Sequence, residues 1–132
     1  LNGSYLNIDK AWHAIQYLIT GTTHSVKTPL KNVVMGGTPL GDAENPDFDF
    51  CSARFLTPSE VKEVAEEITK ISKAEFQARF NPSALVAADI YPTILWQRSG
   101  EELEYLTNYF LLLVKFFQEA AKHEEEVLFY IC

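Results

Sequence analysis

Between residues 57 and 82 the sequence signals the start of a helix three times, and this pattern constrains the fold more than any other. Residues 57–60 read TPSE, a capping box with proline at the first helical position. Residues 72–75 (SKAE) repeat the capping pattern, and Asn81-Pro82 supplies a third start. We therefore predict three consecutive helices. The first has an apolar stripe formed by Val61, Val64, Ala65, Ile68 and Ile71.

Two β-prone runs flank these helices. Residues 50–56 are predicted as a strand, and residues 127–131 (VLFYI) as a buried strand that follows three glutamates. Before the second strand, residues 101–123 predict a long helix. Its apolar stripe is broad enough to require burial in the core or against a partner: Leu103, Leu106, Tyr109, Phe110, Leu113, Val114 and Phe117. The pattern predicts an α+β domain, a small mixed sheet covered by several α-helices with one long helix near the C-terminus.

The first 46 residues give weaker signals. Apolar residues at helical spacing predict a helix that Asn7 caps and Gly21 ends. Thr28-Pro29 predicts a short helix reaching about Met35. Residues 37–46 are rich in glycine, proline, aspartate and asparagine, and we expect them to form a long surface loop.

Length and charge narrow the classes of function. A chain of 132 residues suits one domain, and a net charge of −7 opposes attraction to nucleic acid or to an anionic membrane. The longest apolar run, residues 109–117, is far shorter than the roughly 20 residues that cross a bilayer. No signal peptide is visible, and two cysteines form neither a disulfide framework nor a zinc-ligand spacing, so we expect a cytoplasmic protein.

Few residues stand out for chemistry. The three histidines lack the spacing by which one element presents two ligands to zinc, so we predict no metal site and no cofactor. For His13, a structural bond to a backbone carbonyl is favoured over a catalytic role. Arg54 lies within an apolar strand and must reach either a carboxylate, with Asp9 or Glu60 as candidates, or an anionic ligand. The salt bridge is the favoured alternative.

Three aromatic residues have a polar edge suited to a binding cleft, although such residues are more often core members with one hydrogen bond. The candidate ligand-binding set is therefore Asp9, Trp12, His13, Arg54, Tyr91 and Trp96.

Three blocks carry a resemblance: IDKAWHAI at residues 8–15, ARFLTPSEV at 53–61 and ARFNPSALVAADIYP at 78–92. In these blocks the chain resembles the YfbM-like family of small bacterial proteins, a domain-of-unknown-function family. The resemblance implies a fold and a cytoplasmic compartment but supplies no catalytic set. It also implies a further N-terminal portion, with a strand, before the residues that match 6–12.

The biochemical activity itself is not specified by the sequence, and two hypotheses stay open. The favoured hypothesis is a non-enzymatic bacterial binding or interaction domain, regulatory or immunity-type, with a protein partner or a second copy of itself. The alternative is a small enzyme or ligand-binding domain with a cleft around Asp9, His13, Arg54, Tyr91 and Trp96. The two differ in whether these residues share an open site or are paired with one another.

Overall fold

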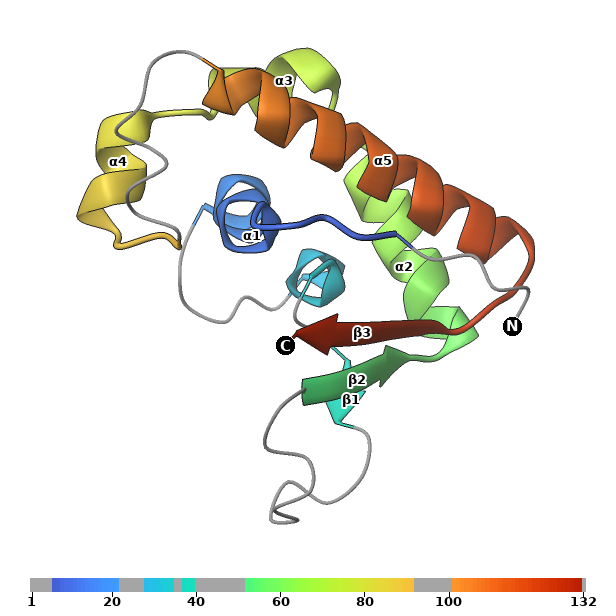
Figure 1. Cartoon of the computed structure of the whole chain (residues 1–132). Helices are drawn as coiled ribbons and strands as arrows, with labels where there is room; N and C mark the ends of the chain where they lie inside the picture. The colour runs from blue at the N-terminus through green and yellow to red at the C-terminus, as the bar shows by residue number, and fades with distance from the viewer. Residues whose placement is uncertain (1–5, 22–27, 35–36, 40–51, 92–100, 132) are drawn as a thin grey trace.

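The computed structural model describes residues 6–21, 28–34, 37–39, 52–91 and 101–131 (Figure 1). Five α-helices, one 3-10 helix and three strands occur in these ranges. In chain order they are α1 (Trp12–Thr20), η1 (Pro29–Asn32), β1 (Thr38–Pro39), β2 (Ser52–Leu56), α2 (Pro58–Thr69), α3 (Lys73–Ala78), α4 (Pro82–Ala87), α5 (Glu102–Lys122) and β3 (Val127–Ile131). The predicted α+β class, with several helices over a small sheet and one long helix near the C-terminus, is confirmed.

The sheet has the order β1-β2-β3. Both described pairings are antiparallel, so the mixed sheet expected from the sequence is not what these residues form. The reason is the path of α5, which packs along α2 and returns the chain to the end of β2 (Figure 1). Val127 therefore pairs with Leu56, and β3 runs back until Ile131 faces Ser52.

The three helix starts predicted between residues 57 and 82 are confirmed. The Thr57 amide donates to Glu60 Oε1 at 3.0 Å, and the Glu60 amide donates to Thr57 Oγ1 at 3.3 Å, which completes the capping box of α2. Ser72 accepts from the Glu75 amide at 3.1 Å, and Asn81 accepts from the Ala84 amide at 3.2 Å. Each cap satisfies a backbone donor that the first helical turn leaves unpaired.

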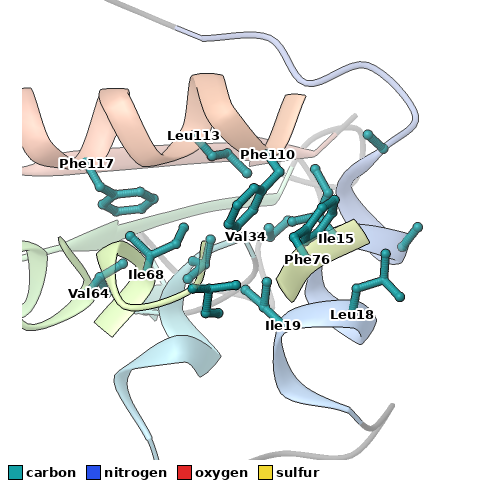
Figure 2. Packing of buried hydrophobic residues seen from close by; sticks show 14 of the residues in the cluster. Ile15, Leu18, Ile19, Val34, Val64, Ile68, Phe76, Phe110, Leu113 and Phe117 are labelled. Carbon is teal, nitrogen blue, oxygen red and sulfur yellow. The ribbon is translucent and has the colours of Figure 1, made fainter. Parts of the chain in front are cut away.

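The core lies where α5 and α2 meet α1, α3 and η1 (Figure 2). The rings of Phe76 and Phe110 stack with centroids 4.1 Å apart and planes 3° apart, which joins α3 to α5. Phe117, further along α5, is fully buried, as is the stripe residue Ile68 of α2. The broad stripe on α5 is thus largely used for packing within the domain. None of the helices in the described ranges is both long and apolar enough to cross a bilayer.

The predicted start of the first helix is wrong. α1 begins at Trp12, and the residue at its N-cap position, Ala11, makes no side-chain hydrogen bond to the first turn. Asn7 instead accepts from the Asp9 amide at 2.8 Å, and Asp9 has φ +52°. This left-handed residue interrupts the helical path, so the chain makes a turn before α1. The predicted end is confirmed, because Gly21 is left-handed at φ +76° and closes the helix.

The second predicted helix is a 3-10 turn that ends at Asn32, without a side-chain cap from Thr28. Of the expected loop over 37–46, Thr38 and Pro39 form β1, paired with Phe55 and Arg54. Residues 40–46 lie outside the described ranges, as do residues 50 and 51 of the predicted first strand.

Candidate functional site

Arg54, the motif arginine of β2, is held by the backbone before β1. Its Nη2 donates to the Gly37 carbonyl at 2.7 Å. The Gly37 amide donates to Asn32 Oδ1 at 3.0 Å, and Asn32 is only 6% exposed. We call Asn32, Gly37 and Arg54 the Gly37 junction. It ties η1, β1 and β2 together.

Gly37 cannot be replaced without strain. Its φ of +83° is in the left-handed region, and a Cβ at this position would overlap the Phe55 carbonyl oxygen. The backbones of residues 37 and 55 can therefore approach only because residue 37 has no side chain. This close approach brings the Gly37 carbonyl within reach of Arg54.

Asp9 makes a different contact. Its Oδ2 accepts from the Tyr105 hydroxyl at 2.8 Å, and the Lys10 amide donates to the same phenol oxygen at 3.1 Å. Burial, together with the bond to Asp9, raises the pKa of Tyr105 well above its usual value. The phenol therefore stays protonated and ties α5 to the turn before α1. Asp9 and Glu60 are the carboxylates proposed as partners of Arg54, and each accepts another hydrogen bond. Asp9 accepts from Tyr105, and Glu60 accepts from the Thr57 amide in the α2 cap.

Trp12, His13 and Tyr91 form a row of rings, which we call the aromatic platform. The Trp12 ring stacks on His13, with centroids 5.2 Å apart and planes 15° apart. It also stacks on Tyr91, with centroids 5.5 Å apart and planes 29° apart. Tyr91 is 46% exposed, so the row ends at the surface. The platform joins α1 to the segment that follows α4.

His13 is fixed in one protonation state by its neighbours. Its Nδ1 lies 2.9 Å from the Tyr91 amide nitrogen and accepts that hydrogen bond, so Nδ1 carries no proton and Nε2 carries the proton of the neutral ring. The bond expected from the sequence, to a backbone carbonyl, is thus a bond to a backbone amide instead. Burial lowers the pKa of His13, and the nearby charge of Asp89 opposes this shift. His13 is accordingly neutral at pH 7.

The candidate set is therefore divided. Trp12, His13 and Tyr91 share the platform, Asp9 lies in the turn before α1, and Arg54 belongs to the Gly37 junction on β2. η1 packs on α1 and α2 and, in Figure 1, lies between α1 and the sheet. Trp96, the sixth candidate, lies outside the described residues.

Sequence reasoning missed three residues around these contacts. Tyr105 anchors Asp9, and Asp89 influences His13. Arg79 Nη1 donates to the Leu18 and Ile19 carbonyls at 3.1 and 3.3 Å, which satisfies acceptors at the end of α1. Arg79 and Asp89 both lie in the block ARFNPSALVAADIYP, where they are the charged residues on either side of an uncharged helix. This isolated placement could have marked them as residues of interest.

The arrangement offers contact surface more readily than reactive groups. In the described part of the chain, no three acidic, histidine or cysteine side chains gather closely enough to hold a metal ion. The platform supplies ring faces and the Nε2 proton of His13. Such groups can bind a partner through stacking and hydrogen bonding.

Comparisons with known proteins agree with this fold. The family model described as a domain of unknown function (DUF1877) matches residues 1–130. A crystal structure of a protein of unknown function, YfbM from Escherichia coli, is similar with a TM-score of 0.69 and 21% sequence identity, over 96% of this chain and 80% of that one. At this identity the likeness concerns the fold. Among curated proteins, none matches the chain.

Proposed function

The chain belongs to the DUF1877 family, whose description assigns no activity, and on that premise we propose a non-enzymatic binding domain that docks a partner protein on the aromatic platform. We place it in the bacterial cytoplasm, in a regulatory or immunity-type role. The observation that carries the proposal is the row of stacked rings that ends at the half-exposed Tyr91.

The polar groups of the candidate residues support binding over catalysis. Asp9 accepts from Tyr105, His13 Nδ1 accepts from the Tyr91 amide, and Arg54 donates to the Gly37 carbonyl. A general acid or base must reach a substrate proton at hydrogen-bond distance. In this chain each of these groups already joins two elements, which is a structural task.

The surface beside the platform also supports docking. α4 and its N-cap carry no charged residue from Asn81 to Ala88, although the chain as a whole has a net charge of −7. Val86 on this helix is 38% exposed. Protein interfaces are depleted of charge at their centre and enriched in aromatic side chains, which often contribute most of the binding energy.

Site-specific photocrosslinking tests the proposal. Benzoylphenylalanine replaces Tyr91 in one variant and Glu63, an exposed residue of α2, in the control, and both are irradiated in the cells that encode the chain. We expect a discrete adduct from position 91 and none of the same mass from position 63. The adduct is identified by mass spectrometry, and its affinity is then measured with purified components.

The variant Tyr91→Ala should weaken this affinity at least about tenfold, the effect of losing one aromatic hot-spot residue. A second copy of this chain in the adduct would identify a homo-oligomer that uses the platform. Equal adducts from both positions, or an affinity unchanged by Tyr91→Ala, would refute docking on the platform.

A further inference from the structure

We propose that the aromatic platform recognises an arginine side chain of its partner, with the guanidinium stacked on the Tyr91 ring and paired with the Asp89 carboxylate. This inference rests on the proposed docking function and names the chemistry of the group that occupies the site.

The exposed part of Tyr91 is suited to a flat cation. One side of its ring stacks on Trp12, and the residue as a whole is 46% exposed. The face of an aromatic ring is electron-rich and attracts a cation within about 6 Å of its centre. Trp12 behind Tyr91 also fixes the orientation of the ring, which lowers the entropy lost when a ligand stacks on it.

Asp89 supplies the opposite charge next to that ring. It is exposed and lies two residues before Tyr91, and its charge opposes the effect of burial on the pKa of His13. Its backbone is held at φ +56°, and its amide donates to the Val86 carbonyl at 3.0 Å. The backbone of Asp89 is therefore held in a turn after α4, two positions before Tyr91.

Charge and shape favour arginine over the other candidate ligands. The net charge of −7 attracts basic segments and repels phosphate backbones. A guanidinium is planar, stacks on aromatic faces and forms paired hydrogen bonds with a carboxylate, whereas the lysine ammonium is a strongly hydrated point charge. A ring face beside a carboxylate therefore matches the planar guanidinium of arginine better than the ammonium of lysine.

His13 makes this recognition sensitive to pH. The neutral ring accepts the Tyr91 amide at Nδ1, and protonation at that atom would break the bond and add a positive charge to the platform. Among the described residues, the ionised group that acts on His13 is Asp89, and the other neighbours of His13 in the platform are the rings of Trp12 and Tyr91. Because burial lowers the pKa of His13, arginine binding should weaken as the pH falls through this lowered pKa, which lies below the ordinary value of 6.5.

Calorimetric titration with tetra-arginine amide, tetra-lysine amide and tetra-citrulline amide tests the proposal in 0.15 M salt, where long-range attraction is screened within about 8 Å. The variants are Tyr91→Leu, which keeps an apolar side chain without the ring, and Asp89→Asn. Glu63→Gln is the matched control, because it removes one exposed carboxylate on α2. Urea unfolding verifies that each variant is folded.

We expect tetra-arginine to bind several-fold more tightly than tetra-lysine, with no binding of the citrulline peptide, whose side chains are uncharged. Tyr91→Leu and Asp89→Asn should each weaken tetra-arginine binding about fivefold or more, and Glu63→Gln less than twofold. Equal losses in Asp89→Asn and Glu63→Gln would show general charge attraction and overturn the proposal. So would an unchanged arginine preference in Tyr91→Leu, or no binding of tetra-arginine.

The crosslinking experiment separates the two proposals. If the captured partner depends on Tyr91 but tetra-arginine does not bind, the arginine inference fails and docking on the platform stands. If position 91 yields no specific adduct, the docking proposal fails, whatever the peptide result.

Discussion

At the Gly37 junction the polar groups face inward, whereas at the aromatic platform the rings lead outward to solvent. The amide and carbonyl of Gly37 bond to Asn32 and Arg54, so these hydrogen bonds hold η1, β1 and β2 together. The platform uses one backbone bond, from Tyr91 to His13, and ends at an exposed ring. Arg54 and the three residues of the platform lie in the sequence blocks that carry the family resemblance. The difference teaches that a charged motif residue such as Arg54 can serve the scaffold, while the surface open to a partner is aromatic.

Within the two compared regions, the largest effect should come from Gly37→Ala. The methyl group would overlap the Phe55 carbonyl oxygen while the backbone is left-handed, so we expect the free energy of unfolding to fall by about 3 kcal/mol or more. Gly21→Ala is the control. It is also left-handed but has no atom within 4 Å of the added Cβ, and should lose only about 1 kcal/mol. Urea unfolding of both variants measures the difference, and equal losses would contradict the close approach at the junction.

Asn32→Ala tests whether the hydrogen bonds of the junction carry weight. Asn32 is 6% exposed, and its replacement leaves the partly buried Gly37 amide without an acceptor. We therefore expect the free energy of unfolding to fall by about 2 kcal/mol. Asn7→Ala is a suitable control, because Asn7 accepts a single exposed amide bond. If both variants unfold at the same urea concentration as the wild type, the junction is not a stabilising unit.

Glu102→Gln extends the comparison to a third place. It removes the charge of a buried carboxyl group, one oxygen of which lacks a hydrogen bond among the described residues, whereas the Gly37 amide and carbonyl are both bonded. Glu102 is 6% exposed at the start of α5, and its Oε1 has no hydrogen-bond partner among the residues that the structure describes. A buried acceptor without a hydrogen bond costs about 1 to 3 kcal/mol, and more when it is charged, whereas the helix dipole offsets only about 1 kcal/mol. The variant should be more stable by about 1 kcal/mol in urea. Glu104→Gln, an exposed residue of the same turn, should instead be slightly destabilising, and a loss of stability in Glu102→Gln would count against an unpaired charge.

Acidification should weaken the platform before the junction. Because burial lowers the pKa of folded His13 below 6.5, the unfolded chain binds the proton more readily than the folded one. The contribution of His13 to stability is therefore complete above pH 6.5 and is lost as the pH falls from there through the lower folded pKa. His13→Phe should remove this part of the pH dependence in urea titrations. A raised folded pKa for His13, measured by NMR, would reverse the sign and contradict the assignment.

The smallest effect on stability should come from Tyr91→Ala. The residue is 46% exposed and stacks on one ring, so we expect a change within about 1 kcal/mol, although the affinity for the partner should fall at least about tenfold. Phe76→Ala is the contrasting variant, with a loss of about 3 to 5 kcal/mol, because that ring is fully buried against Phe110. A large loss of stability in Tyr91→Ala would make Tyr91 a core residue and remove the case for a docking surface.

The parts of the fold that could be predicted from sequence are those set by neighbours along the chain. Thr57, Ser72 and Asn81 each bond an amide three residues away, so their caps were readable as short patterns. The start of α1 was not, because it depends on the left-handed Asp9, and Asp9 is held by Tyr105, 96 positions away. The same holds for Arg79, which reaches α1 across 61 positions.

The candidate site was predicted only in part, for the same reason. Sequence chemistry selected His13, Tyr91 and Arg54 as residues of interest, but which of them meet is decided by packing between distant elements. His13 and Tyr91 are 78 positions apart and share a hydrogen bond, whereas Arg54 bonds to Gly37, a position chosen by a backbone conformation that no side-chain pattern signals.

The pairing of β2 with β3 has a consequence for synthesis of the chain. Leu56 pairs with Val127, so about 70 residues must be translated after β2 before its second neighbour exists. At 5 to 20 residues per second, this interval is roughly 4 to 14 s. During that time the two-residue β1 is the one described strand beside β2, and the other edge of β2 can pair with any extended chain nearby. The nascent protein therefore passes through a period in which a chaperone at the ribosome would most reduce its aggregation.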